Sequence, residues 1–226
     1  MTPDDWRTCP DLDAMLTFAR RRANFSQRKR RLFACGCCQR LGPLLPEAHR
    51  RALAVAEQFA DGLVSQAALT TAWSRASFDD VTRSNHAAWA AWAVAGDPRD
   101  ALLTQTLLSN ISLYAANAIA NRPLRACSVD PRSAPTWHVE RTRHRSLLRD
   151  VIHPFRTGPL DATHLPATVT AIAGTIYEER RFEELPILAD ALEEAGCENP
   201  DLLAHCRAAG EHVRGCWAVD WLLGKQ

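Results

Sequence analysis

The sequence predicts an all-α protein, a multi-helix bundle or array of about nine to eleven short and medium helices. Apolar residues recur at helical spacing in almost every segment of the 226 residues, a pattern typical of helices with one buried face. No stretch of four or more residues alternates apolar and polar side chains as a half-buried strand does. Glycine and proline fall mostly between the periodic segments, where helices end.

Start and stop signals place the helices of the first half in order. Leu12, Met15 and Leu16 form the apolar stripe of the first helix. Ser26 is a suitable N-cap for the second, and Gly42 with the following proline should end or kink it. Helices are expected at about 11–21, from 26 to 42, and at 46–62, 65–73, 86–95 and 97–121.

The apolar period is lost between residues 122 and 136, where prolines and scattered polar residues predict a loop or linker. It separates an N-terminal helical region, 1–121, from a C-terminal helical region, 137–226, and the two are expected to pack together as one domain. Asn199 and the proline after it form an N-cap and first helical residue. The helices of this second half are expected at about 138–151, 169–176, 185–196, 199–210 and 212–223.

Composition excludes several protein classes. The chain is 46% hydrophobic and 23% charged, with 27 basic against 26 acidic residues. No apolar run approaches the roughly 20 residues of a membrane helix, and the acidic start MTPDDW lacks signal-peptide character. A cytoplasmic protein is therefore expected. In a reducing compartment the eight cysteines indicate buried small hydrophobes, metal ligands or a nucleophile rather than disulfides.

The near-zero net charge hides an uneven distribution. Acidic residues dominate from 178 to 201. Seven cations without an acid crowd the segment 20–31: Arg20, Arg21, Arg22, Arg28, Lys29, Arg30 and Arg31. Guanidinium groups clustered in this way can neutralise nucleic-acid phosphates or meet an acidic protein partner. The alternative is a patch that is solvated, or that pairs with the acidic segment within the chain or across a dimer.

Cysteine and histidine cluster twice. Cys35 and Cys38 share one helical face, and His212 and Cys216 share another one turn apart, with Cys206 close in sequence. If the two clusters met, these five residues would offer the thiolate and imidazole ligands that zinc prefers. The spacing matches no known zinc module, and apolar neighbours favour buried core cysteines as the alternative. Zinc is the one cofactor that the sequence suggests.

A cysteine nucleophile is a further hypothesis. Cys206 with His212 is the best pair, oriented by a contact between His212 and Asp220. Neither residue adjoins a glycine-rich loop or lies in a cysteine-protease signature. The chain contains no zinc-protease helix motif, P-loop or dinucleotide fingerprint. No catalytic residue is therefore assigned.

Several motifs at the two ends of the chain are distinctive together. They are the opening DDW with DLDAML, RKRRLFACGCC at 28–38, AVAEQFADG at 54–62, LPILADALEEAGC at 185–197, HCR at 205–207, HVRGCW at 212–217 and LLGK at 222–225. The chain in these segments resembles a multi-copy family of uncharacterised proteins found mainly in planctomycetes. The likeness covers about half the chain and leaves 63–145 unmatched. Because this family has no established activity, the resemblance implies kinship and no mechanism.

Three functions follow, in order of preference. The first is a non-enzymatic helical interaction or accessory protein, whose partner is another protein or a second copy of the chain and not a membrane. The second is a zinc-stabilised helical module that contacts nucleic acid through the segment Arg20 to Arg31. The third is a cysteine-dependent enzyme using Cys206 and His212.

Overall fold

The protein is all-α in the computed structural model, which describes residues 1–22, 24–76, 85–96, 103–120, 134–156 and 165–225. Every regular element among these residues is a helix and none of them lies in a strand, so the predicted fold class is confirmed. None of the described helices is both long and apolar enough to cross a membrane.

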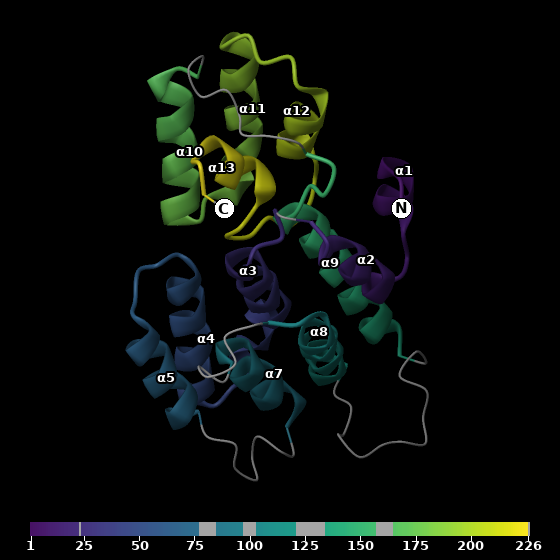
Figure 1. Cartoon of the computed structure of the whole chain (residues 1–226), viewed down its shortest axis with the longest axis vertical. Coiled ribbons are helices and arrows are strands. Elements are labelled where there is room, and N and C mark those ends of the chain that lie inside the picture. The colour runs from purple at the N-terminus through teal and green to yellow at the C-terminus, as the bar shows by residue number, and fades with distance from the viewer. Residues whose placement is uncertain (23, 77–84, 97–102, 121–133, 157–164, 226) are drawn as a thin grey trace.

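The first lobe, which we call the N-lobe, comprises residues 1–156. Its central helix is α3, which packs against α4, α7, α8 and α9 (Figure 1). The core around it contains Leu16, Phe33, Leu41, Ile111 and Leu147, all fully buried. The helices are α1 (Pro3–Thr8), α2 (Leu12–Ala19), α3 (Gln27–Cys38), α4 (Glu47–Ala60), α5 (Gln66–Arg75), α7 (His86–Ala95), α8 (Gln105–Ile119) and α9 (Pro135–Val151), with a 3-10 helix η1 (Gln39–Leu44) after α3.

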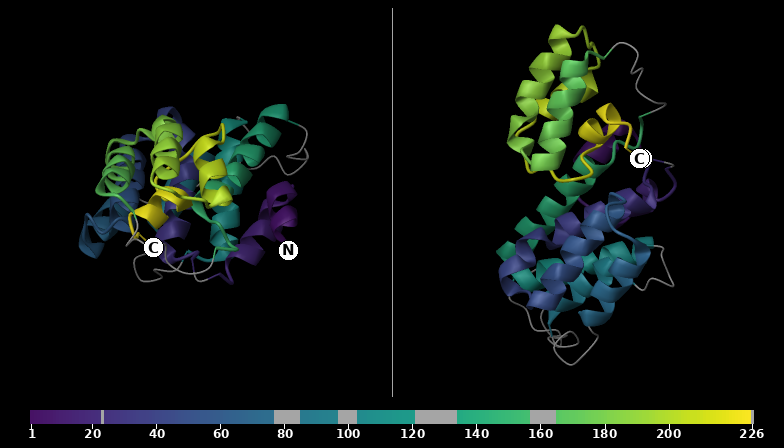
Figure 2. Two further views of the ribbon diagram at one scale, coloured as in Figure 1. Left: turned by 90° about the horizontal axis from the view of Figure 1, so that it is seen from above. Right: turned by 90° about the vertical axis from the view of Figure 1, so that its left-hand side faces the viewer.

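The second lobe, the C-lobe, comprises residues 165–225 and has a core of its own around Ile176, Leu188, Leu202 and Val219. It stands at one end of the elongated molecule, beyond the N-lobe helices (Figures 1 and 2). Its helices are α10 (Ala167–Glu179), the 3-10 helix η4 (Phe182–Glu184), α11 (Leu185–Glu194), α12 (Pro200–Arg207) and α13 (Trp217–Leu222).

Predicted caps define several helix ends. The side chains of Ser26, Ser65 and Asn199 accept hydrogen bonds from the first-turn backbone of α3, α5 and α12, which satisfies donors that a helix start leaves free. Gly96 ends α7 at φ 70°, a backbone conformation that side chains with a Cβ rarely adopt. These local signals act within one turn, so the sequence alone reveals them.

Other boundaries differ from the sequence prediction. The short helix α1 was not predicted; Thr2 and Asp5 form a reciprocal capping box there. Thr104 caps α8, so this helix begins at Gln105, while residues 97–102 of the predicted helix lie outside the described residues. The predicted linker at 122–136 also lies outside them up to residue 133, and Pro135 already belongs to α9.

The structure groups α9 with the N-lobe rather than with the residues that follow it. It packs on α8, α3 and α2, and Leu147, Leu148 and Val151 enter the N-lobe core. The reason is its buried stripe, which faces apolar side chains of α3 and α8. The division between the two cores therefore falls after α9, later in the chain than the predicted linker.

One loop of the C-lobe reaches into the N-lobe. Residues 211–215 connect α12 to α13, and each of them contacts an N-lobe residue. Val213 packs in the N-lobe core. The polar contacts pair Glu211 with Arg143, His212 with Asp150, Arg214 with Asp61 and the carbonyl of Gly215 with Lys29. This loop joins the lobes and positions the group of side chains described next.

Candidate metal centre

Four side chains with metal-binding chemistry meet where the two lobes touch. They are Asp150 from α9, His205 from α12, and His212 and Cys216 from the segment that leads to α13. One ligand atom of each lies within 4.8 Å of the other three. The exposed fractions are 4% for Asp150, 16% for His205, 9% for His212 and 0% for Cys216. This buried group can hold a metal ion between the lobes.

Asp150 lies in the last turn of α9 and provides the N-lobe contribution. Its Oδ1 accepts hydrogen bonds from His212 Nδ1 at 2.6 Å and His205 Nε2 at 3.2 Å, and its Oδ2 accepts one from the backbone N–H of Val213 at 3.0 Å. Burial opposes ionisation, but the hydrogen bonds and positive potential of the two histidines outweigh it and hold the pKa of Asp150 at about 2. The group thus contains an ionised carboxylate.

His205 is oriented by the indole of Trp217. The indole N–H donates to Nδ1 at 3.1 Å, so Nδ1 presents a lone pair. Nε2 lies 3.2 Å from both Asp150 Oδ1 and Cys216 Sγ. In this tautomer Nε2 carries the hydrogen and donates it to the carboxylate.

His212 and Cys216 owe their positions to a break in the predicted helix 212–223. That helix begins only at Trp217, because the backbone turns at Gly215, which adopts φ 94°. Glycine suits this position also because a Cβ here would lie 3.0 Å from the Leu32 side chain. The helical spacing expected for His212, Cys216 and Asp220 is therefore wrong, although His212 and Cys216 still converge. The turn between them, closed by a hydrogen bond from the Cys216 N–H to the Val213 carbonyl at 2.9 Å, brings both side chains to Asp150.

Burial and neighbours determine how these two groups ionise. Burial lowers the pKa of His212, but the hydrogen bond and charge of Asp150 more than compensate and raise it. Burial raises the pKa of Cys216 well above that of a free thiol, and the charge of Asp150 adds to this effect. Without a cation the cysteine is therefore a neutral thiol, and a bound metal ion would be needed to convert it to a thiolate.

A second buried aspartate joins the lobes through basic side chains of α3. Asp220 in α13 pairs with Arg28 at 2.6 Å and with Lys29 at 2.5 Å. Arg28 also contacts Asp61 at 2.9 Å and donates to the Tyr177 hydroxyl at 2.6 Å. We call this set the Asp220 joint, and the group of Asp150, His205, His212 and Cys216 the Asp150 joint.

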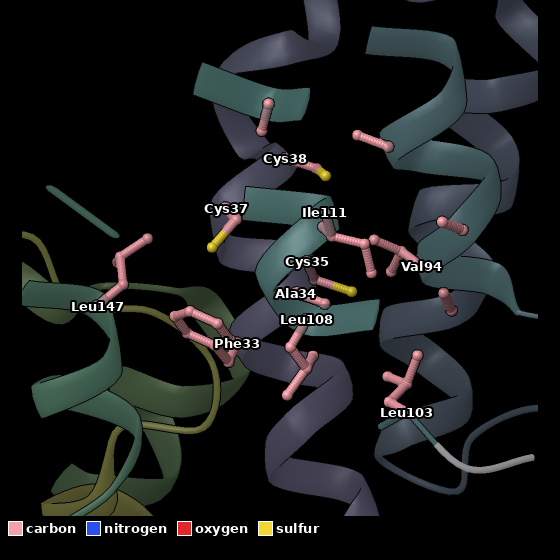
Figure 3. Packing of buried hydrophobic residues seen from close by; sticks show 14 of the residues in the cluster. Phe33, Ala34, Cys35, Cys37, Cys38, Val94, Leu103, Leu108, Ile111 and Leu147 are labelled. Carbon is pink, nitrogen blue, oxygen red and sulfur yellow. The ribbon is translucent and has the colours of Figure 1, made fainter. Parts of the chain in front are cut away.

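The first predicted cysteine cluster does not reach the Asp150 joint. Cys35 and Cys38 lie in the N-lobe core on α3, where Figure 3 shows their sulfur atoms among apolar side chains such as Ile111 and Leu108. Burial raises the pKa of both thiols. These two residues are therefore core cysteines, the alternative that the sequence offered. They lie apart from the ligand group because their face of α3 packs against the helices of the N-lobe.

The predicted nucleophile, base and orienting acid have separate partners. Cys206 is fully buried in the C-lobe core, and burial, helped by Cys197, raises its pKa to about 12. His212 bonds Asp150, while Asp220 pairs with the cations of α3. The expected contact between His212 and Asp220 is replaced by these two, because Gly215 turns His212 away from the helix that carries Asp220.

The basic segment 20–31 is mostly turned inward. Arg28 and Lys29 belong to the Asp220 joint. Arg31 is buried and donates to the carbonyls of Val94 and Ala95 at the end of α7. The remaining contacts are Arg30 with the carbonyls of Phe25, Leu103 and Arg20, and Arg22 stacked 4.4 Å from the Phe18 ring. Among the seven cations, Arg20 and Arg21 are the exposed ones.

Two members of the metal-binding group, His205 and Asp150, were not predicted as ligands from the sequence. His205 was noted beside Cys206, yet in α12 it is the histidine that faces the joint, while Cys206 turns into the core. Asp150 carried one signal: it is one of two acids, with Glu140, in an arginine-rich helix, and it lies next to the buried Val151. An acid at such a position needs a partner, but only the fold identifies which.

A cleft of about 510 Å³ opens between the lobes beside this group. It is lined by Leu32, Leu53 and Phe182, by the ion-paired Glu57 and Arg180, and by His212. Of the four ligands, His212 is the one that lines this cleft.

Comparisons with protein-family models, with curated proteins and with solved structures find no match to this chain. The resemblance to planctomycete proteins stays a prediction.

Proposed function

We propose that the protein is a non-enzymatic helical accessory protein whose two lobes are joined by a zinc ion, with Asp150, His205, His212 and Cys216 as ligands. The observation that carries the proposal is the convergence of four ligand atoms within 4.8 Å of one another, buried and drawn from both lobes. Its partner is another protein or a second copy of the chain.

The donor set favours zinc. One thiol, two imidazoles and one carboxylate are ligands of the kinds that zinc takes in proteins, whereas magnesium and calcium prefer oxygen alone. Bonds of zinc length in a tetrahedron place ligand atoms about 3.3 to 3.8 Å apart. The 3.2 Å separations of His205 Nε2 from Asp150 and from Cys216 need only small adjustments to meet that geometry.

The same set favours a structural role. Four protein ligands fill a tetrahedron, whereas a catalytic zinc keeps one position for water or substrate. Asp150 and Cys216 are buried, and His205 and His212 are half-buried, which also restricts access by a substrate. Because the ligands come from both lobes, a metal ion here would stabilise the arrangement of the lobes.

The other two hypotheses have weaker support. Nucleic-acid binding through segment 20–31 relies on cations of which four already bind partners inside the protein. Catalysis by Cys206 relies on a fully buried thiol whose pKa lies at about 12. Neither the patch nor the thiol therefore enters the proposal.

Zinc analysis of the purified full chain tests the proposal. We expect about one zinc per chain, and in the cobalt-substituted protein a thiolate-to-cobalt charge-transfer band, both lost in Cys216→Ser. Cys206→Ser is the matched control, because it removes another buried C-lobe cysteine that is not part of the group, and it should keep both signals. Zinc binding that is absent from the wild type, or unchanged in Cys216→Ser, would overturn the metal centre.

A further inference from the structure

Trp217 is in direct contact with one of the proposed ligands. It is the first residue of α13, with 5% of its surface exposed. Its Nε1–H donates to Nδ1 of His205 at 3.1 Å, and the two ring centroids lie 4.8 Å apart. The indole therefore holds the ring edge that faces away from Asp150 and Cys216.

This hydrogen bond determines which lone pair His205 can offer. The indole nitrogen is a donor only, so Nδ1 must accept, and the hydrogen of the neutral imidazole is on Nε2. Nε2 is the atom that faces the other ligands. A metal ion binds an imidazole nitrogen through its lone pair, which requires the hydrogen to be on Nδ1 instead. Two hydrogens would then face each other between His205 and Trp217.

We propose that Trp217 lowers the metal affinity of the Asp150 joint by holding His205 in the tautomer that cannot bind metal. The inference rests on the proposed function. Metal binding moves the His205 hydrogen to Nδ1 and breaks the hydrogen bond from the indole. In the metal-free state that bond satisfies Nδ1 of His205, and three N–H groups satisfy the carboxylate of Asp150. The centre is thereby built to release and take up metal.

The surroundings of Trp217 leave space for the displaced indole. A cavity of about 190 Å³ is lined by Trp217 together with His153, Phe155 and Trp221. In most zinc sites the second ring nitrogen of a histidine ligand donates to a carboxylate or carbonyl. Here it accepts from an indole, and a shift of that indole into the cavity relieves the conflict.

Replacement of Trp217 by phenylalanine tests the inference. Trp217→Phe keeps an aromatic ring and removes the donor, so zinc should bind about tenfold tighter, because a hydrogen bond of ordinary net strength no longer opposes binding. Affinity is measured by competition with a chromophoric zinc chelator on the full chain. Trp73→Phe is the matched control: its indole lies on α5 in the N-lobe and donates to no ligand of the group, so the zinc affinity of this variant should equal that of the wild type.

A second measurement follows the indole N–H signal of Trp217 in the wild-type protein while zinc is added. Proton–nitrogen spectra of the wild type contain one indole N–H signal that the Trp217→Phe spectrum lacks. On zinc addition that signal should move toward the position of an indole without a hydrogen bond, and the nitrogen shifts of His205 should report the change of tautomer.

The outcomes separate the inference from the proposed function. Equal or weaker zinc binding by Trp217→Phe, or an indole signal that stays in place when zinc binds, overturns the role of Trp217 and leaves the metal centre intact. Failure of wild type and Trp217→Phe alike to bind zinc overturns both. Tighter binding by Trp217→Phe, with zinc affinity unchanged in Trp73→Phe, supports the inference.

Discussion

The Asp150 joint and the Asp220 joint connect the same two lobes with different chemistry. Each buries an aspartate, with 4% of the Asp150 side chain and 1% of the Asp220 side chain exposed. Asp220 is neutralised by Arg28 and Lys29. Asp150 is held by two histidines and a backbone N–H, beside a thiol. One joint therefore pairs its carboxylate with basic side chains of the protein, while the other can exchange its hydrogens for a metal ion.

The largest expected effect is at the Asp220 joint. Asp220→Ala leaves two buried cations without their shared partner, which typically costs about 3 to 5 kcal/mol of unfolding free energy. Urea unfolding measures it. Asp190→Ala removes a carboxylate from an exposed pair with Arg207 and should cost less than about 1 kcal/mol. Similar losses in the two variants would show that the Asp220 joint contributes no more than a surface pair.

Zinc should act on the Asp150 joint alone. With free zinc at about 100 times its dissociation constant, binding to the folded state adds about 2.7 kcal/mol to the unfolding free energy. Urea unfolding of the wild type in zinc and in chelator measures this gain, and Cys216→Ser should show none. A gain of the same size in Cys216→Ser would mean that zinc stabilises the protein elsewhere.

Gly215 belongs to the loop that serves both joints, so its replacement tests whether they are coupled. Gly215→Ala places a Cβ at φ 94° and within 3.0 Å of Leu32, for which we expect a loss of about 1 to 3 kcal/mol in thermal or urea unfolding together with weaker zinc binding. Gly42→Ala, where a Cβ meets open space, is the control and should stay within about 1 kcal/mol. Unchanged zinc affinity in Gly215→Ala would contradict the coupling.

The smallest expected effect is a difference in pH dependence. The pKa of His212 is raised on folding, so its contribution is fully present below about pH 6.5 and is lost as the pH rises through the folded value. That of Asp150 is lowered to about 2, so its contribution is present above about pH 4 and is lost as the pH falls through 2.

Near neutral pH, zinc should reverse the fall of the unfolding free energy with rising pH. Binding displaces hydrogens from Cys216 and from any protonated His212, so affinity should rise with pH by about tenfold per unit for each proton released. Unfolding free energies between about pH 5.5 and 8.5 should therefore fall with pH in chelator and rise in zinc, through the contribution of this joint. Parallel pH profiles in the two buffers would contradict this assignment of the ligands.

The helical fold and several helix ends could be predicted because their causes are local. The stripe of Leu12, Met15 and Leu16, the N-cap Ser26 and the terminating Gly96 each act within one or two turns of chain. The sequence also pointed to His212 and Cys216 as a candidate pair. That prediction relied on placing His212 and Cys216 one turn apart on a helix, whereas the structure has a turn at Gly215 between them.

The sequence by itself thus determined an all-α chain with cysteine and histidine near its C-terminal end. Only the tertiary structure decided that Asp150 and His205 complete the group, that Cys35, Cys38 and Cys206 belong to the cores, and that the cations of segment 20–31 mostly face inward. The physical reason is the separation along the chain of the residues that interact. A helix depends on neighbours a few residues away, whereas the group joins residues 150 and 216, which meet only because the two cores pack against a shared loop.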